Sequence, residues 1–107
     1  MRTANLYSMA LAAILIASGA LCFAENPGVA VYKTKCLHCH GETGMADTSM
    51  ARTLKVKPIS DPEVKKMSLK EMIDATRNGM GKMQAYKDSL TEAEIKGSTE
   101  YFRSFMK

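Results

Sequence analysis

Two cysteines and a histidine in the segment Cys36-Leu37-His38-Cys39-His40 restrict what this chain can fold into more than any other feature. This C-x-x-C-H spacing is the pattern of covalent haem attachment. Each thiol forms a thioether with a vinyl group on one edge of the haem, and the two intervening residues let both sulfurs reach that edge. The histidine that follows directly is then placed beneath the iron as its proximal ligand. The spacing therefore predicts that Cys36, Cys39 and His40 hold one haem c with its iron.

Zinc binding and dithiol redox chemistry are the alternative uses of a cysteine pair. A structural zinc site takes four ligands, usually from two such pairs, but the chain has no second C-x-x-C and only two histidines, both inside the motif. A thioredoxin-like dithiol is expected beside a βαβ unit, whereas the sequence around this motif has a helical pattern. His38 lies between the cysteines, where it is expected to face solvent rather than bind iron. Haem attachment is therefore the favoured interpretation.

The first 24 residues have the composition of an export signal. Arg2 precedes an uncharged run from Met9 to Ala24 that is rich in Ala, Leu and Ile. This run is shorter than the roughly 20 residues that a membrane-spanning helix needs, and the small residue at its end suits a cleavage site. We expect residues 1–24 to be a signal peptide and residues 25–107 to form one domain, without a membrane span, in the periplasm or another extracytoplasmic space. A retained N-terminal anchor is the alternative.

The size and charge of the predicted domain narrow its function further. Cys22 falls in the predicted signal, so the exported domain keeps only Cys36 and Cys39. Unpaired thiols are a liability in an oxidising compartment, so both cysteines are expected to have a function there. A domain this small buries little of its own surface and is often stabilised by a metal or cofactor. The chain has 15 Lys and Arg against 11 Asp and Glu. Because these charges alternate in sign, they argue against a nucleic-acid partner.

Helical signals recur along the predicted domain, and no run alternates with the period of two that marks a strand. Ser68 with Glu71, and Thr91 with Glu94, form capping boxes that start helices. Gly79 is expected to end the first of these helices, because glycine tolerates the left-handed conformation that closes a helix. The expected elements are a helix over 29–35, one or two helical turns within 47–55, a helix over 69–77, a loop over 79–89 and a final helix from 91 to about 106. The domain is predicted to be all-α.

The second axial ligand of the iron is expected to be a methionine, because both histidines lie in the motif and a soft thioether suits haem iron. Met72 is assigned to the apolar face of its helix, and Met106 lies near the end of the chain. Met80 and Met83 lie in a loop with two glycines, where the backbone can approach a flat cofactor closely. The candidates in the predicted domain are Met45, Met50, Met67, Met72, Met80, Met83 and Met106.

These segments together resemble the small bacterial class I cytochromes c along nearly the whole predicted domain. The likeness is carried by Gly28 and Tyr32, by the C-x-x-C-H motif with Gly41, by Gly79-Met80-Gly81-Lys82-Met83-Gln84-Ala85-Tyr86, by Leu90-Thr91-Glu92-Ala93-Glu94-Ile95 and by Tyr101-Phe102.

The resemblance implies a cytochrome c-like fold, in which short helices wrap around one covalently bound haem and the N- and C-terminal helices cross. It implies that this crossing uses small residues such as Gly97. It also implies that Met83 binds the iron opposite His40, and that the Pro58 carbonyl orients the His40 ring. The family has proline after the ligating methionine, whereas this chain has Gln84. Because proline would stiffen the loop, a more labile bond between Met83 and the iron is expected here.

The predicted function is that of an electron carrier and not of an enzyme. With His40 and Met83 in both axial positions, little substrate chemistry is available to the iron. We expect an exported monomer that exchanges single electrons with redox proteins, and Lys82 and Lys87 are expected to help it dock on acidic patches. The alternatives are a haem-based ligand sensor and an electron-feeding subunit of a larger oxidoreductase.

Overall fold

The computed structural model describes residues 26–107, so the predicted signal peptide and Cys22 lie outside the described residues. The described part is helical, as predicted, and its only β-type pairing is a single bridge between Met80 and Met83. The elements in chain order are α1 (Pro27–Val31), a π-helical turn (Tyr32–Cys36), α2 (Leu37–His40), α3 (Ser49–Leu54), α4 (Pro62–Lys65), α5 (Leu69–Asn78) and α6 (Glu92–Arg103). Between residues 26 and 107, no helix is both long enough and apolar enough to cross a membrane.

The first helical segment is longer than predicted at both ends. It begins at Pro27, because the Asn26 side chain accepts a hydrogen bond from the Gly28 N–H (3.0 Å) and proline is favourable in the first turn. Helical backbone then continues without a break through the π-helical turn and α2 to His40. The prediction over 29–35 was therefore wrong about both boundaries, and the haem-attachment motif lies inside this continuous helical segment.

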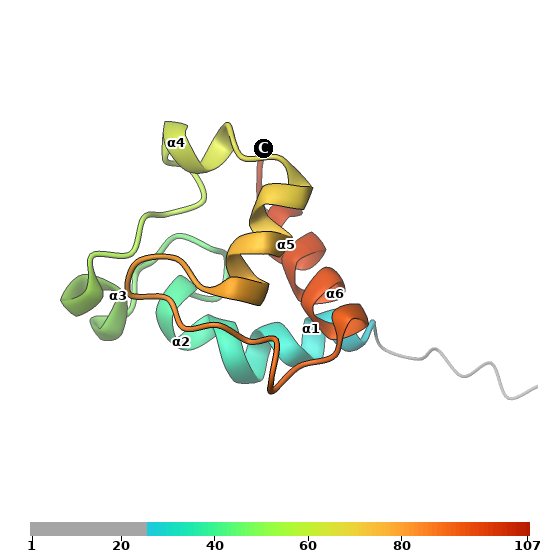
Figure 1. The fold of residues 1–107 in the computed structure, drawn as a ribbon. Helices are drawn as coiled ribbons and strands as arrows, with labels where there is room; N and C mark the ends of the chain where they lie inside the picture. Colours follow the sequence, from blue (N-terminus) through green and yellow to red (C-terminus); the bar gives the residue numbers. More distant parts are fainter. Residues whose placement is uncertain (1–25) are drawn as a thin grey trace, which may run out of the picture.

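The α1 and α6 helices cross at two glycines. A Cβ atom on Gly28 would lie 2.1 Å from the carbonyl carbon of Gly97, and one on Gly97 would lie 3.0 Å from the Gly28 Cα. The backbones of the two helices therefore touch, which no other residue at position 28 would permit. The predicted crossing of the terminal helices is confirmed, and it lies at the opposite end of the molecule from α3 (Figure 1).

The core lies beside this crossing. Val31, Leu90 and Ile95 form a buried cluster, against which Ile73 and Tyr86 pack. Tyr32 is 1% exposed and packs against an aromatic group on and just beyond α6. The members of that group are Tyr101, Phe102 and Phe105, with ring centroids 5.2 to 6.2 Å from that of Tyr32.

The two longest helices start at the predicted caps. At Thr91 the capping box is complete: Thr91 Oγ1 accepts from the Glu94 N–H, and the Glu94 carboxylate accepts from the Thr91 N–H. At Ser68 only half of it forms, because the Glu71 carboxylate accepts from the Ser68 hydroxyl rather than from the backbone. Both helices begin within one residue of their predicted starts.

Candidate haem site

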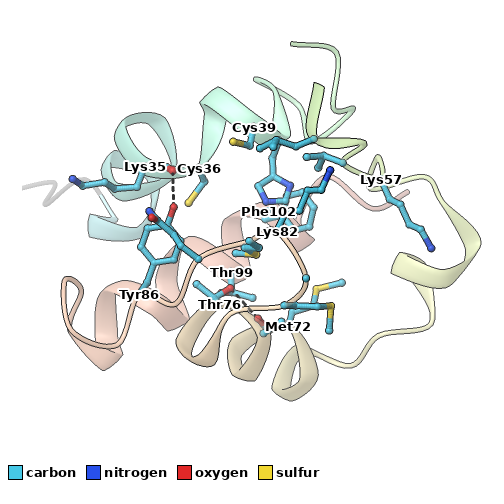
Figure 2. Close-up of a pocket in the computed structure, with 18 of the residues that line it drawn as sticks. Lys35, Cys36, Cys39, Lys57, Met72, Thr76, Lys82, Tyr86, Thr99 and Phe102 are labelled. Atoms are coloured by element: carbon cyan, nitrogen blue, oxygen red, sulfur yellow. Dashed lines mark hydrogen bonds between the residues drawn. The ribbon is translucent and has the colours of Figure 1, made fainter. Parts of the chain in front are cut away.

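A cavity of about 730 Å³ opens between α2, α3, α5 and the loop that precedes α6. Cys36 and Cys39 lie on one side of it, and Met72, Thr76 and Thr99 lie on the other (Figure 2). Its volume is within the range of about 300 to 1,000 Å³ that is usual for ligand and cofactor sites. Apolar side chains on the wall include Leu54, Val56, Val64, Met67, Ala75 and Phe102.

Both cysteines of the motif line the cavity as free, half-buried thiols. Burial, followed by the neighbouring Cys39, raises the pKa of the Cys36 thiol to about 11. The Cys36 thiol is therefore protonated at neutral pH. Two unpaired thiols that face the same apolar cavity are suitably placed to bind a cofactor with two reactive groups on one edge.

His40 also lines the cavity, with its ring against Phe102 at a centroid separation of 4.9 Å. Burial lowers the pKa of His40, so its imidazole is held neutral, which is the form that binds a metal. The expected hydrogen bond to Pro58 is not formed: His40 Nδ1 is buried without a partner among the described residues. The Pro58 carbonyl instead accepts from the Asp61 N–H at 2.9 Å, because it belongs to the turn that leads into α4.

Several hydrogen bonds hold the backbone at the end of the motif. The buried Tyr32 hydroxyl donates to the Gly41 carbonyl at 2.6 Å, directly after His40. Burial strongly raises the pKa of Tyr32, so this hydroxyl keeps its proton. The Thr48 hydroxyl donates to the His38 carbonyl at 2.7 Å, which ties the start of α3 to the motif. None of these contacts has a local sequence signal, because each joins residues nine or more positions apart.

Met80 and Met83 lie on the wall of the same cavity, in a tight turn of residues 80–83 that we call the methionine hairpin. The Met80 N–H donates to the Met83 carbonyl (3.1 Å) and the Met83 N–H donates to the Met80 carbonyl (2.9 Å). Gly79 precedes the hairpin with φ of +82°, and a Cβ there would lie 2.9 Å from the Met83 carbonyl oxygen. Met83 is half-buried, whereas Met80 is 59% exposed.

The other candidate methionines divide into two groups. Met50, Met67 and Met72 line the cavity, and Met72 is 5% exposed, in agreement with its predicted place on the apolar face of α5. Met45 and Met106 are not part of the cavity wall. The structure thus brings five of the seven candidates together with His40.

Basic side chains surround the cavity, and no acidic side chain of the described residues lines it. These basic side chains are lysines, Lys82 among them, and all of them are exposed. Lys87 is exposed but lies away from the wall, and His38 is also exposed, as expected. The lysines on the wall are Lys35, Lys55, Lys57 and Lys82.

The residues present fit a covalently attached haem. Two free thiols, an imidazole that burial favours in its neutral form, and soft thioethers surround an apolar cavity. Within residues 26–107, no three His, Cys, Asp or Glu side chains are grouped so that they could share a metal ion. A helical domain with this motif on the wall of such a cavity has the architecture of a c-type cytochrome.

Comparisons with known proteins lead to the same class. Residues 24–102 match the family described as cytochrome C oxidase, cbb3-type, subunit III. None of the curated proteins compared with the chain matches it. Among solved structures, the KustC0563 c-type cytochrome is 29% identical with a TM-score of 0.67, over 75% of this chain and 98% of that one.

Two further solved structures share the fold at lower identity. Cytochrome c6C from Synechococcus sp. PCC 7002 is 23% identical with a TM-score of 0.55, over 73% of this chain and 92% of that one. The c-type cytochrome XoxG from Methylobacterium extorquens AM1 is 23% identical with a TM-score of 0.57, over 75% of this chain and 48% of that one. The chain therefore belongs to the family of cytochrome C oxidase, cbb3-type, subunit III, and is a c-type cytochrome, a haem protein of electron transfer.

Proposed function

We propose that this chain is an exported mono-haem c-type cytochrome that transfers single electrons, with the iron held between His40 and Met83. The observation that carries the proposal is that Cys36, Cys39, His40 and Met83 all line one apolar cavity. When bound, haem supplies an iron that cycles between the ferric and ferrous states. Cys36 and Cys39 would supply the two sulfurs of the thioethers, His40 and Met83 would supply the nitrogen and sulfur that bind the iron, and the wall around them would be mostly apolar.

Met83 is favoured over Met80 as the axial ligand because its side chain is half-buried, whereas that of Met80 is 59% exposed. A thioether shielded from water raises the reduction potential of the haem, and the half-buried Met83 is the better shielded of the two. Gly79 supports this role, because only a residue without a Cβ permits its approach to the Met83 carbonyl.

Filled axial positions explain why an electron carrier is favoured over an enzyme. Substrate chemistry at haem iron needs an open coordination position and a polar group beside it. His40 and Met83 would occupy both positions, and the side chains around them are mostly apolar. The outer edge of the cofactor would then be the route for electrons.

The basic rim of the cavity supports docking on acidic redox partners. Lys35, Lys55 and Lys82 are exposed at the wall and form no ion pair with any residue of 26–107, while Lys57 pairs weakly with Glu63 at 3.6 Å. Charges of one sign around a redox centre steer an oppositely charged partner toward it. The rate of reduction by an acidic partner should fall as ionic strength rises from 10 to several hundred mM, because salt shortens the Debye length. A rate that is independent of salt would refute docking through these lysines.

The export signal over 1–24 and the domain over 25–107 belong to the same proposal. The apolar run before Glu25 supports it, and haem attachment gives Cys36 and Cys39 a use in an oxidising compartment, where lone thiols are a liability. Mass spectrometry of the haem-bearing protein from the periplasmic fraction should give a chain that starts at Glu25. A haem-bearing chain that retains residues 1–24 in the membrane fraction would instead indicate the anchor.

The decisive experiment on the iron ligands replaces Met83 by a stronger ligand. The wild-type haem should remain attached after acid–solvent extraction, and the ferric protein should show the sulfur-to-iron charge-transfer band. Met83→His should abolish that band and lower the reduction potential of the haem, because imidazole binds in place of the thioether. Met50→His, at a different methionine of the cavity wall, is the control and should keep the band. If Met83→His keeps the band, residue 83 does not face the iron.

The family description, which names a subunit of an oxidase, supports a second candidate function. In that case the chain would feed electrons within a larger assembly rather than diffuse freely. The two functions differ in hydrodynamic size: a free carrier purified from its own cells should elute as a monomer of about 10 kDa, as expected for a domain of this length. Co-elution of all the haem with a larger complex would favour the subunit.

A further inference from the structure

Met80 and Met83 are paired so that both thioethers face the same way. The two residues exchange both backbone hydrogen bonds, 3.1 and 2.9 Å in length. In an antiparallel pair of this kind the Cα atoms lie about 5.5 Å apart, and the side chains project from the same face. Both side chains do line the cavity with His40. The hairpin therefore presents two thioethers, not one, at the wall opposite the motif.

The Met80 side chain is not used for packing. It is 59% exposed, the most exposed of the large apolar side chains in the described part of the chain. Methionine has three rotatable side-chain bonds and adapts its position readily. The Met80 sulfur is therefore free to move in a way that the half-buried Met83 sulfur is not.

The backbone of the hairpin is fixed at its base and unrestrained at its tip. A Cβ on Gly79 would lie 2.9 Å from the Met83 carbonyl oxygen and 3.1 Å from the Ala85 nitrogen, whereas nothing lies within 4 Å of the Cβ position of Gly81. Gln84 leaves φ free at the position that proline would restrict. The tip of the hairpin at Gly81 is therefore open, and a side chain there would meet no packed neighbour.

We propose that Met80 is an alternative axial ligand that takes the place of Met83 on the iron. This inference rests on the proposed ligation by His40 and Met83. In the exchange the bond from Met83 sulfur to iron breaks and a bond from Met80 sulfur to iron forms, while no electron or proton is transferred. The exchange keeps the coordination full whenever Met83 dissociates, so small external ligands meet a closed site.

No other methionine of the cavity is placed for this exchange. Met50 on α3 and Met67 between α4 and α5 lie outside the hairpin, although both line the cavity and Met50 is also exposed (36%). Met72 is 5% exposed and belongs to the packed face of α5. Among these methionines, only Met80 is joined to Met83 by backbone hydrogen bonds. Its side chain is therefore the only one that the hairpin holds on the same side as the Met83 side chain.

The test compares single and double variants of the haem-bearing protein by absorption spectroscopy and carbon monoxide titration. Met83→Ala should keep a shifted sulfur-to-iron band, and Met83→Ala with Met80→Ala should lose it. Met83→Ala with Met50→Ala is the matched control and should keep it. If Met80 occupies the iron nine-tenths of the time, the ferrous Met83→Ala protein should bind carbon monoxide about tenfold more weakly than the Met80/Met83 double variant.

The possible results separate this inference from the proposed function. If Met83→Ala alone loses the band and binds carbon monoxide as tightly as the double variant, Met80 does not replace Met83, but ligation by Met83 stands. If Met80→Ala alone loses the band, Met80 is the resting ligand and the assignment of Met83 fails. A band that survives in the double variant overturns both, because a third residue then supplies the sulfur.

Discussion

Replacing Gly28 by alanine should test the contact between α1 and α6 more directly than any other change. The new Cβ would lie 2.1 Å from the Gly97 carbonyl carbon, 2.3 Å from its oxygen and 2.6 Å from its Cα. All three obstructing atoms are backbone, so no change of rotamer relieves the overlap. Ordinary contact begins near 3.4 Å, and the helices must therefore separate by roughly 1.3 Å.

The size of the effect follows from that separation. A gap of 0.5 to 1 Å already removes about a quarter to a half of the dispersion energy between two surfaces. Val31 and Ile95, buried beside the crossing, would lose part of their contact. Overpacking usually costs about 1 to 3 kcal/mol, and we place Gly28→Ala at about 3 kcal/mol or more because nothing flexible can yield. That is a large part of a total stability of about 5 to 15 kcal/mol.

Gly97→Ala is the matched control, because the same methyl group is added on the other side of the contact. Its Cβ would lie 3.0 Å from the Gly28 Cα and 3.2 Å from the Gly28 nitrogen, so a shift of a few tenths of an ångström suffices. Alanine is also about 1 kcal/mol better than glycine inside a helix. The two effects oppose each other, and we expect a net change of less than about 1 kcal/mol.

Urea unfolding of the haem-bearing protein, followed by circular dichroism, measures both changes. With an m-value of about 1.5 kcal/mol/M, Gly28→Ala should lower the unfolding midpoint by about 2 M, and Gly97→Ala by less than about 0.7 M. Equal midpoints for the two variants, or a loss below 0.5 M for Gly28→Ala, would show that the helices do not touch at these backbones.

Three further changes test other parts of the structure. Tyr32→Phe should destabilise the protein by about 1 to 2 kcal/mol in urea unfolding, because it keeps the buried ring but leaves the Gly41 carbonyl without its 2.6 Å hydrogen bond. Gly79→Ala should weaken the sulfur-to-iron band, because its Cβ would press on the methionine hairpin from 2.9 Å and its φ is +82°. The Arg77 guanidinium lowers the pKa of Glu92, so their pairing stabilises the folded state above about pH 4.5 and is lost as the pH falls through the lowered value. The difference in unfolding midpoint between wild type and Arg77→Gln should therefore shrink from pH 6 to pH 3, and a constant difference would contradict it.

The sequence predicted the starts of α5 and α6 and the end of α5, because neighbouring residues determine these helix ends. Ser68 and Thr91 start their helices because a hydroxyl three residues before an acidic side chain satisfies the first free N–H groups. Gly79 ends α5 with a positive φ, as its position after Asn78 predicts. These features depend on residues within one turn of one another, so the sequence alone contains them.

Other features depend on contacts that are distant in the sequence. The π-helical turn at Tyr32–Cys36 has no local signature, and it lies where Tyr32 is held by α6 aromatics and by the Gly41 carbonyl. The pairing of Met80 with Met83 was also not predicted, although two glycines marked the segment as a turn. The resemblance correctly predicted that Gly97 lies at the helix crossing. It was wrong about Pro58, because the chain between α2 and α5 places that carbonyl in a turn of its own.

The double variant Cys36→Ser with Cys39→Ser tests whether the domain depends on its cofactor. Without haem, the cavity of about 730 Å³, which is lined mostly by apolar side chains, would be left open to water at the centre of the domain. Water could occupy part of it, but the wall offers few polar partners. A domain this small buries too little surface elsewhere to offset the exposure of that apolar wall. We therefore expect the variant to lose haem on extraction and to show no cooperative thermal transition by circular dichroism. A cooperative transition near that of the wild type would mean that the helix crossing and the cluster around Ile95 hold the fold without the cofactor.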